Sequence, residues 1–305
     1  MRREVVLLSF LAFSSLLLGC IPGIGPRKEA KVIPTDGVVI TDFSSDMPRY
    51  EDTEQISLYI EVQNLGGTTA SDVDITILGA TWEPDETKLK HETGTLKAPD
   101  LTVTPPVPGE FESWSTTLSA YDLPEGVVLP VTLTARVEYN YSSNGAVHIP
   151  VLSKEEYKRR LQRGIAIPSA PNVTNSAGPI HIDIDPRGLP PVLREARENI
   201  TLLILLKNVG SGVPINATGG EGMITANLTL LGLNSRFVDC SDYNVTPLPA
   251  SSTKVRVRLR RGESAKIPCT VELDKPTAHE MLSLLFKSDY RYYTEKQLTV
   301  TIVGT

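Results

Sequence analysis

The chain has 305 residues, of which 22% are charged and 40% are hydrophobic, and its formal net charge is −6. This length is enough for two domains of about 100 to 150 residues each. The acidic balance argues against a nucleic-acid-binding protein, which normally carries a basic face. Abundant glycine and proline, with little tryptophan, favour many short strands joined by tight turns.

Residues 1–19 predict a cleaved signal peptide. Arg2 and Arg3 give a positive start, and the apolar run from Val5 to Leu18 is shorter than the about 20 residues that cross a membrane. The run ends in Leu-Leu-Gly-Cys, which resembles the lipobox of bacterial and archaeal lipoproteins. The resemblance implies that Cys20 carries a diacylglyceryl group and becomes the mature N-terminus. A pair of lipid chains would then hold the protein on the membrane.

The alternatives are an ordinary signal peptide with a chance cysteine and an uncleaved membrane anchor. Residues 20–37 predict a lipidated tether, because they are rich in proline and glycine and lack hydrophobic periodicity. Such a chain is flexible enough to lift a domain clear of the lipid headgroups.

The body of the chain contains a weak internal repeat. ISLYIEVQNLGG from Ile56 aligns with ITLLILLKNVGSG from Ile200, and both predict a strand that ends in an Asn-x-Gly turn. Each copy is predicted to close with a tyrosine-bearing hairpin, at residues 132–151 and 284–304. We therefore expect an all-β fold of two immunoglobulin-like β-sandwich domains, residues 38–152 and 180–305.

The alternating strand that ends in Val-x-Asn-x-Gly, followed by a loop with Ala70 and Asp72, resembles the CARDB-type immunoglobulin-like modules of archaeal and bacterial surface proteins. The second copy departs from the pattern, because residues 214–222 lengthen its loop. The resemblance implies adhesion, spacing or envelope-associated domains, and it brings no catalytic residues with it.

Residues 153–179 predict a helical connector and a linker between the domains. Ser153 and Glu156 form the pattern of a capping box, and the helix runs to Gly164. Residues 167–179 are predicted to be extended, since they are rich in proline, serine and asparagine. We expect the helix to pack on a sandwich, and a partner-binding helix is the alternative.

Two further cysteines, Cys240 and Cys269, lie in the second domain. An exported chain favours a disulfide between them, and metal ligation is the alternative. The chain also contains Asn-x-Ser/Thr sequons, which predict glycosylation unless threonine-rich strands produce them by chance. They begin at Asn140, Asn172, Asn199, Asn216, Asn227 and Asn244. Sequons together with a lipobox are typical of the exterior of an archaeal cell.

A strand over His181, Asp183 and Asp185 would place an imidazole and two carboxylates on one face, which could seed a calcium or zinc site. The simpler interpretation is the solvated face of an edge strand. A second pattern predicts a basic stripe that binds anionic lipid or an acidic glycan, or that prevents edge-to-edge pairing. It consists of Lys254, Arg256, Arg258 and Arg260.

These patterns predict a lipid-anchored surface protein on the extracytoplasmic face of the membrane, acting in binding, adhesion or scaffolding. We expect a protein or glycan partner, no nucleic acid, no cofactor and no enzymatic activity, because the sequence contains no catalytic or nucleotide-binding motif. The alternatives are a structural subunit of a pilus or surface layer, with residues 31–43 donated as a strand, and a metal-binding accessory domain of a surface enzyme. The sequence leaves the oligomeric state open.

Overall fold

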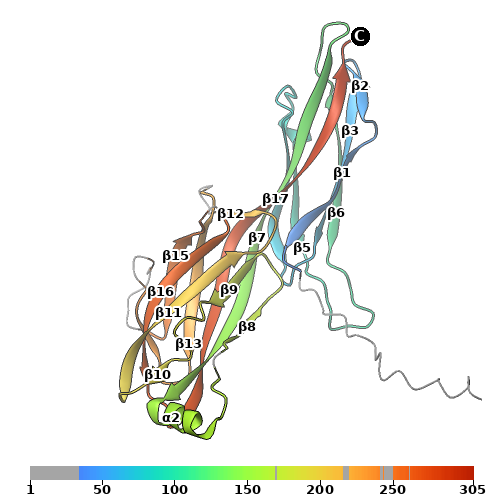
Figure 1. The fold of residues 1–305 in the computed structure, drawn as a ribbon. Helices are drawn as coiled ribbons and strands as arrows, with labels where there is room; N and C mark the ends of the chain where they lie inside the picture. Colours follow the sequence, from blue (N-terminus) through green and yellow to red (C-terminus); the bar gives the residue numbers. More distant parts are fainter. Residues whose placement is uncertain (1–33, 169, 216–219, 241–242, 244–249, 261) are drawn as a thin grey trace, which may run out of the picture. The chain divides into compact units, whose positions relative to one another are not determined.

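The computed structural model describes residues 34–305 except 169, 216–219, 241–242, 244–249 and 261. The described part is dominated by strands, with a 3₁₀ helix η1 (Glu86–Lys88) and an α-helix α2 (Lys154–Arg163) (Figure 1). The strands are β1 (Val38–Ser45), β2 (Arg49–Glu51), β3 (Gln55–Asn64), β4 (Ala70–Leu78), β5 (Lys90–Leu96), β6 (Phe111–Ser119), β7 (Val128–Ser153), β8 (Asn172–Asn175), β9 (Ile180–Ile184), β10 (Val192–Leu193), β11 (Arg197–Asn208), β12 (Val213–Ile215), β13 (Met223–Leu231), β14 (Arg236–Asp239), β15 (Ser252–Arg258), β16 (Ser264–Asp274) and β17 (His279–Val303).

The strands form β-sandwiches, and the predicted all-β fold is confirmed. One sheet has the order β1-β3-β6, another has the order β14-β16-β11-β9, and a larger sheet has the order β15-β13-β17-β7-β4-β5. We call β1, β3 and β6, together with β4, β5 and the first part of β7, the first sandwich. The second sandwich consists of β9, β11, β14 and β16, together with β13, β15 and the first part of β17.

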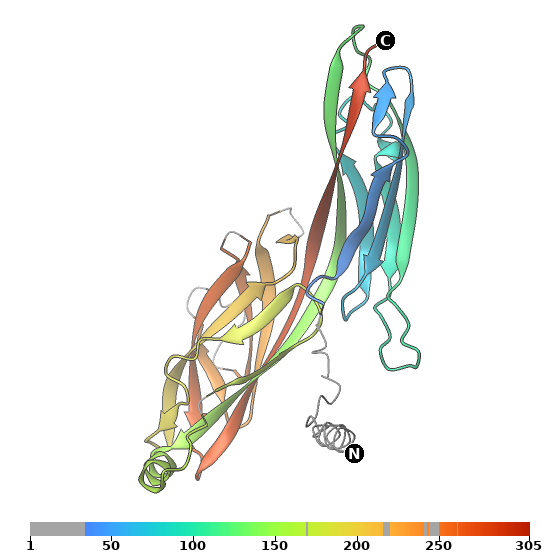
Figure 2. The ribbon, with the colours of Figure 1, turned by 45° about the vertical axis from the view of Figure 1, so that its right-hand side comes forward.

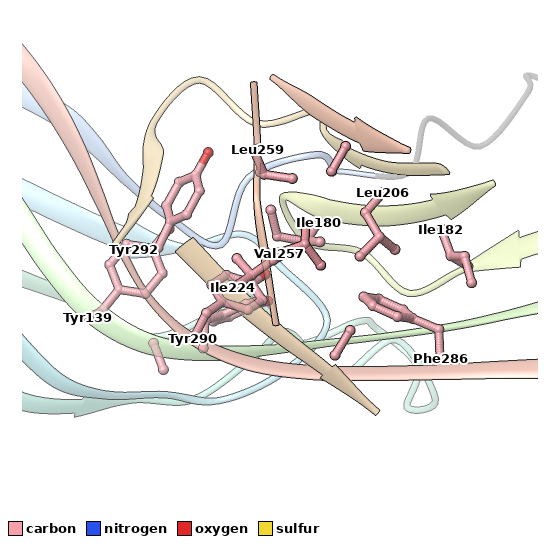
Figure 3. Packing of buried hydrophobic residues seen from close by; sticks show 14 of the residues in the cluster. Tyr139, Ile180, Ile182, Leu206, Ile224, Val257, Leu259, Phe286, Tyr290 and Tyr292 are labelled. Atoms are coloured by element: carbon pink, nitrogen blue, oxygen red, sulfur yellow. The ribbon is translucent and has the colours of Figure 1, made fainter. Parts of the chain in front are cut away.

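Alternating burial explains why these segments form strands. In β3, Ile56, Leu58, Ile60 and Val62 are buried while the residues between them are exposed or half-buried. In the second sandwich, Ile182 and Leu206 from one sheet pack near Val257 and Phe286 from the other (Figure 3). Burial of such side chains from both inner faces is the main stabilising term of a β-sandwich.

The strand register shows the internal repeat in detail. Val38 at the start of β1 lies opposite Asn64 at the end of β3, and Ile180 at the start of β9 lies opposite Asn208 at the end of β11. Strand β4 lies between β5 and β7, as β13 lies between β15 and β17. Even the short strands correspond, because β2 and β10 each pair in parallel with the end of a long strand.

The tyrosine-bearing segments are long strands, and the prediction of a hairpin at each was wrong. Strands β7 and β17 pair in antiparallel register from Val128 opposite Val303 to Leu152 opposite His279, and they run side by side in both ribbon views (Figures 1 and 2). The Ser-Ser-Asn-Gly stretch at residues 142–145 is extended in the middle of β7. A Cβ on Gly145 would lie 2.6 Å from Ile182 Cγ2, so this glycine allows close packing rather than a turn.

The pairing of β7 with β17 joins the two sandwiches through hydrogen bonds. The first part of β7 pairs with β4, and the first part of β17 pairs with β13. The second part of β7 then runs alongside the second sandwich, and the second part of β17 runs alongside the first. A division of the chain at residue 152 therefore separates strands that are paired with each other. The linker also contains a strand, since β8 pairs with residues 145–148 of β7.

Helix α2 confirms the predicted connector helix. The Ser153 hydroxyl accepts a hydrogen bond from the Glu156 N–H at 3.3 Å, and Gly164 ends the helix at a φ of 64°. The second bond of the predicted capping box is absent. The Glu156 carboxylate pairs with Arg159 and Arg160 of its own helix, and Ser153 N–H donates to the carbonyl of Ala278.

The predicted disulfide between Cys240 and Cys269 is present. Both cysteines are fully buried. Cys240 directly follows β14, and Cys269 lies on β16, which pairs with β14. The bond therefore fastens β14, at the edge of its sheet, to the neighbouring strand β16.

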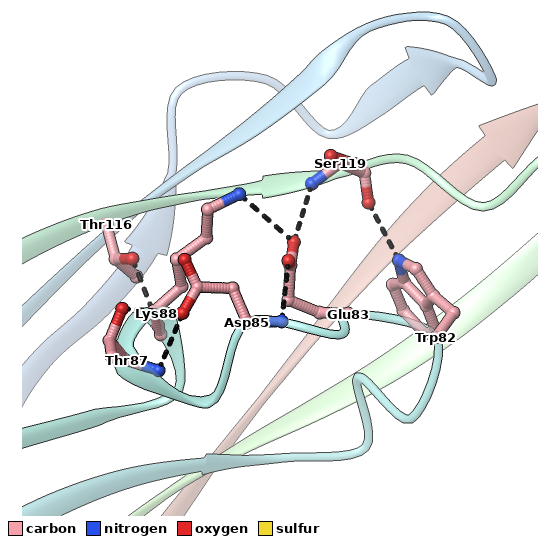
Figure 4. A network of polar contacts seen from close by, with 7 residues as sticks. All are labelled: Trp82, Glu83, Asp85, Thr87, Lys88, Thr116 and Ser119. Carbon is pink, nitrogen blue, oxygen red and sulfur yellow. Dashed lines mark hydrogen bonds and ion pairs between the residues drawn. The ribbon is translucent and has the colours of Figure 1, made fainter.

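The edge of β6 is covered at its C-terminal end by the segment before η1 (Figure 4). The Glu83 carboxylate accepts hydrogen bonds from the N–H groups of Ser119 at 3.1 Å and Asp85 at 3.3 Å, and it pairs with Lys88 at 3.4 Å. Trp82 Nε1 donates to the Ser119 carbonyl at 2.7 Å. Side chains thus satisfy the backbone groups that another strand would otherwise pair.

Candidate functional site

The first Asn-x-Gly turn is bound to a long strand by a tyrosine. Asn64 Oδ1 accepts from the Gly66 N–H at 3.0 Å, which closes the turn. Two residues later, the Thr68 N–H donates to the Tyr141 hydroxyl on β7 at 3.1 Å. A Cβ on Gly66 would lie 1.9 Å from that hydroxyl oxygen. Glycine is therefore required where the turn meets the tyrosine.

The second Asn-x-Gly turn repeats this arrangement on β17. Asn208 Oδ1 accepts from the Gly210 N–H at 3.2 Å, and the Gly212 N–H donates to the Tyr292 hydroxyl at 3.0 Å. A Cβ on Gly210 would lie 2.7 Å from the same hydroxyl. The repeat detected in the sequence therefore extends to individual hydrogen bonds.

Four tyrosines meet where the long strands pass from one sandwich to the other. Neighbouring rings of Tyr139, Tyr141, Tyr290 and Tyr292 have centroids 5.8 to 6.4 Å apart, and Tyr139, Tyr290 and Tyr292 are seen in Figure 3. Burial raises the pKa of Tyr139 well above its usual value, so the cluster is neutral at physiological pH. Such ring packing adds to stability beyond the area that it buries.

The segments that precede β1 and β9 each fasten the turn of the opposite sandwich. Asp36 Oδ1 accepts from the Ser211 N–H at 2.7 Å, and the Gly67 N–H donates to the Ala177 carbonyl at 3.0 Å. These contacts, with the tyrosine cluster, hold the middle of β7 and β17 in one arrangement.

The opposite face of the same strands carries a groove of about 1020 Å³, which we call the central groove. Its floor is the outer face of β7 and β17, and its walls come from the start of β4 on one side and from β12 and β13 on the other. The residues that line it are Thr69, Ser71, Arg136, Glu138, Asn140, Tyr141, Ser142, Ile215, Glu221, Met223, Ile224, Thr225, Asp289, Tyr290, Arg291 and Tyr293.

Ion pairs join the charged side chains of the groove floor. Arg291 pairs with Asp74 at 3.0 Å and with Glu138 at 3.2 Å, and Arg136 pairs with Glu295 at 2.6 Å. Arg291 on β17 pairs with carboxylates of β4 and β7, and Arg136 on β7 pairs with a carboxylate of β17, which restrains both guanidinium groups. The floor is therefore both polar and held in place before any ligand binds.

An aromatic ring and a more exposed carboxylate add to the groove. The guanidinium of Arg136 lies 4.4 Å from the centre of the Tyr293 ring, and the Tyr293 hydroxyl donates to Glu221 at 3.0 Å. Asp289 is 63% exposed. The groove thus offers hydroxyls, amides, carboxylates and guanidinium groups beside apolar surface from Ile215, Met223 and the tyrosine rings. That combination suits a ligand rich in hydroxyl or amide groups better than an apolar one.

The described sequons differ in accessibility. Asn172, Asn199 and Asn227 are exposed on strands, and Leu228 beside Asn227 is buried, as the alternation predicted. Asn140 is half-buried in the central groove, where its side-chain amide donates to Asp72. A glycan at Asn140 would occupy the groove. Asn216 and Asn244 lie outside the described residues.

His181 and Asp183 share one face of β9, as predicted, and Asp185 directly follows the strand, but each carboxylate binds a cationic side chain. Asp183 pairs with Lys207 at 2.6 Å and Asp185 with Arg187 at 2.6 Å. The Arg187 hydrogen bonds lower the pKa of Asp185 to about 2. Burial lowers the pKa of His181. Within the described residues, no group of three or more histidine, cysteine, aspartate or glutamate side chains is placed to hold a metal ion.

The predicted basic stripe lies at a sheet edge. Lys254, Arg256 and Arg258 are exposed on β15, the outermost strand of its sheet, and Arg260 follows the strand. The Arg256 N–H donates to the Tyr243 carbonyl at 3.0 Å, so part of this edge is already covered. This location is the one expected of charges that prevent pairing between sheet edges.

The predicted signal peptide, Cys20 and most of the tether lie outside the described residues. In the part of the chain that the structure describes, no helix combines the length and the apolar character needed to span a membrane.

The central groove was not predicted from the sequence. A signal was present, because Arg136 and Glu138 alternate with buried Val137 and Tyr139 in the middle of a long strand. Paired charges on one face of a strand are ordinary by themselves. Only the pairing of β7 with β17 brings Arg291 and Asp289 beside them.

No protein-family model and no curated protein matches the chain. Among solved structures, it is similar to native E. coli alpha-2-macroglobulin, with 10% identity over 88% of this chain and a TM-score of 0.23, and it spans 17% of that protein. It is also similar to the Enterococcus faecalis MSCRAMM ACE, described as binding its ligands by the collagen hug model, with 11% identity, 88% coverage and a TM-score of 0.16. The collagen adhesin of S. aureus gives 9% identity, 89% coverage and a TM-score of 0.12. This chain spans 95% and 94% of the two adhesin structures, respectively.

Proposed function

We propose that this chain is a lipid-anchored surface protein on the extracytoplasmic face of the membrane, and that its central groove binds a protein or glycan partner. The groove is the observation that carries the proposal. Its floor is fixed by ion pairs on one face, and the tyrosine cluster supports it from the other. The buried disulfide supports an oxidising compartment, and the lipobox-like sequence supports the anchor.

In finer terms, we propose an archaeal lipoprotein that resembles CARDB-type modules, is glycosylated at its exposed sequons and has no catalytic activity. The ligand class follows from the groove chemistry. Arg136 and Arg291 are already paired with carboxylates, so an anionic ligand would compete with Glu138 and Glu295 for them. A neutral ligand that presents hydroxyls or amides can bind without breaking those pairs.

The test uses the soluble chain, residues 21–305, labelled with a fluorophore and applied to cells of the source organism and to an array of defined oligosaccharides. A charge reversal in the groove, Asp289→Lys, is compared with a matched reversal on β5, Glu92→Lys. Asp289 is 63% exposed and Glu92 is 77% exposed, so both variants should fold.

We expect Asp289→Lys to weaken binding at least tenfold, while Glu92→Lys binds as the natural chain does. Protease treatment of the cells abolishes binding if the partner is a protein, and periodate treatment abolishes it if the partner is a glycan. Equal binding by both variants would remove the groove from the proposal.

The alternative role as a pilus or surface-layer subunit relied on strand donation by residues 31–43. In the structure, Val38–Ser45 pairs with β3 of its own sandwich, and Val38 is fully buried. Donation would require this strand to leave its own core. The structure therefore supports a binding module better than a subunit that assembles by this route.

A further inference from the structure

One exposed loop is longer in the first copy of the repeat than in the second. In the first sandwich, residues 97–110 connect β5 to β6. In the second, the shorter stretch 259–263 connects the equivalent strands β15 and β16. We call residues 97–110 the apolar loop. It is an addition to the first copy, and such additions carry specific functions more often than the strands that support them.

The apolar loop exposes hydrophobic side chains at its tip. Leu101 is 56% exposed, Val103 41% and Val107 53%, and Pro105 and Pro106 are also exposed. Exposed apolar side chains grouped on one loop indicate a site that contacts a membrane or another protein. Phe111, 63% exposed at the start of β6, lies beside the base of the loop.

Hydrogen bonds and prolines account for part of the backbone of the apolar loop. Asp100 and Val107 exchange two backbone hydrogen bonds of 3.0 Å, and the Thr102 N–H donates to the Asp100 carboxylate at 2.8 Å. Pro105, Pro106 and Pro108 have no N–H group. An unpaired backbone donor is costly in a lipid environment, so these hydrogen bonds and prolines lower the cost of entering one.

An ion pair lies at the base of the apolar loop, and one further carboxylate, that of Asp100, lies beside its tip. Lys97 Nζ pairs with the Glu110 carboxylate at 2.9 Å, and this contact raises the pKa of Lys97 and lowers the pKa of Glu110. Both groups therefore stay charged at neutral pH. Asp100 also stays charged, since its hydrogen bonds with Thr102 lower its pKa. The Lys97–Glu110 pair would stay at the level of the headgroups.

The apolar loop begins close to the point where the described chain starts. Leu65 N–H donates to the Gly37 carbonyl, and Asn64 N–H donates to the Glu110 carbonyl at the base of the loop. Gly37 and Glu110 are thus two strand spacings apart, about 10 Å. Residues 20–33, which separate Cys20 from this point, reach at most about 50 Å when fully extended.

We infer that the apolar loop inserts its tip, Leu101–Pro106, into the outer leaflet of the membrane that holds the chain. The inference rests on the proposed lipid anchor, because a tip of this size binds weakly by itself. At about 0.8 kcal/mol per buried CH2, two aliphatic side chains give only a weak contact with the membrane. The lipid anchor sustains this contact by keeping the loop at a high local concentration beside the bilayer. The contact orients the first sandwich with its loop end toward the membrane.

The test couples Cys20 of the mature chain, residues 20–305, to a maleimide phospholipid in phosphatidylcholine vesicles. Cys240 and Cys269 form the disulfide, so Cys20 is the thiol available for coupling. A Val103→Trp variant is compared with a matched Leu231→Trp variant at the end of β13, where Leu231 is 49% exposed. Brominated phosphatidylcholine then quenches tryptophan that enters the bilayer.

We expect bromolipid to remove most of the fluorescence that the Val103→Trp change adds, and to leave the Leu231→Trp variant and the natural chain unchanged. Adding Leu101→Ser to the Val103→Trp variant should reduce the quenching. Absence of quenching in the Val103→Trp variant, or equal quenching in both variants, would overturn the inference. Chemical coupling supplies the lipid, so this outcome is independent of whether cells modify Cys20.

Discussion

The Tyr292 hydroxyl donates a 2.9 Å hydrogen bond to Oδ1 of Asn208, which links the long strand β17 to the turn that follows β11. The same hydroxyl accepts from the Gly212 N–H, and the tyrosine is fully buried. One side chain therefore connects a strand shared by both sandwiches with the second copy of the repeated turn. Burial also raises the pKa of Tyr292 well above its usual value, so it stays a donor at physiological pH.

Replacing Tyr292 with phenylalanine should destabilise the chain by about 1 to 3 kcal/mol, because the half-buried Gly212 N–H loses its acceptor. The matched control is Tyr293→Phe, whose hydroxyl reaches Glu221 in the open groove and should matter by less than about 0.5 kcal/mol. Urea unfolding of both variants measures the difference. Equal stabilities would show that the turn does not depend on this contact.

Gly66→Ala should destabilise the first sandwich strongly, since the new Cβ would lie 1.9 Å from the Tyr141 hydroxyl and 3.0 Å from the Asp36 carbonyl. Removing the hydroxyl with Tyr141→Phe should recover part of the loss, and a double-mutant cycle measures the coupling. Additive effects of the two changes would contradict the steric explanation. Gly94→Ser, at a glycine of φ 86° with open space around it, separates backbone strain from side-chain collision.

Loss of the Cys240–Cys269 disulfide should lower the free energy of unfolding by roughly 3 to 4 kcal/mol in the chain-entropy model, given a sequence separation of 29. The paired replacement Cys240→Ala with Cys269→Ala gives the loss without a reductant. The change should appear as a lower denaturant midpoint. An unchanged midpoint would mean that the bond does not constrain the unfolded chain.

Acid should weaken the contacts of Glu83. Burial raises the pKa of this carboxyl, but the N–H groups of Ser119 and Asp85 and the ammonium of Lys88 outweigh it and lower the pKa below its usual value. A lowered pKa in the folded state contributes stability above the unfolded pKa of about 4.3, and that stability is lost as the pH falls through the folded value.

Glu83→Gln should therefore cost about 1 to 3 kcal/mol at pH 7 and progressively less below pH 4. Glu86→Gln, in the neighbouring 3₁₀ helix, is exposed and serves as the control. Thermal unfolding of the three chains between pH 3 and 7 gives the comparison. A Glu83→Gln effect that is constant across this range would contradict the ionic contribution.

The sequence predicted the parts of the fold that depend on local patterns. Alternation in Ile56–Val62 gave a strand, Ser153 gave the start of α2, and the two later cysteines gave the disulfide. The sequence did not predict the features that depend on contacts between residues far apart in the chain. The hairpin predicted over residues 132–151 is one strand, because β7 pairs with β17 along almost its whole length.

In the candidate site, too, local features were predicted from the sequence and long-range ones were not. The repeated Asn-x-Gly turns were visible in the sequence, but the tyrosines that bind them lie more than seventy residues further along the chain. The central groove depends on the register of β7 with β17, which places Arg291 opposite Asn140. No local pattern specifies such a long-range register, since either strand alternates equally well against many partners.

The mass of the native chain extracted from the membrane tests the central claim most directly. A lipid-anchored surface protein should begin at Cys20, carry a lipid on that residue and contain the Cys240–Cys269 disulfide. A chain recovered from the cytosol with Met1 still present, no lipid on Cys20 and both later thiols free would contradict it.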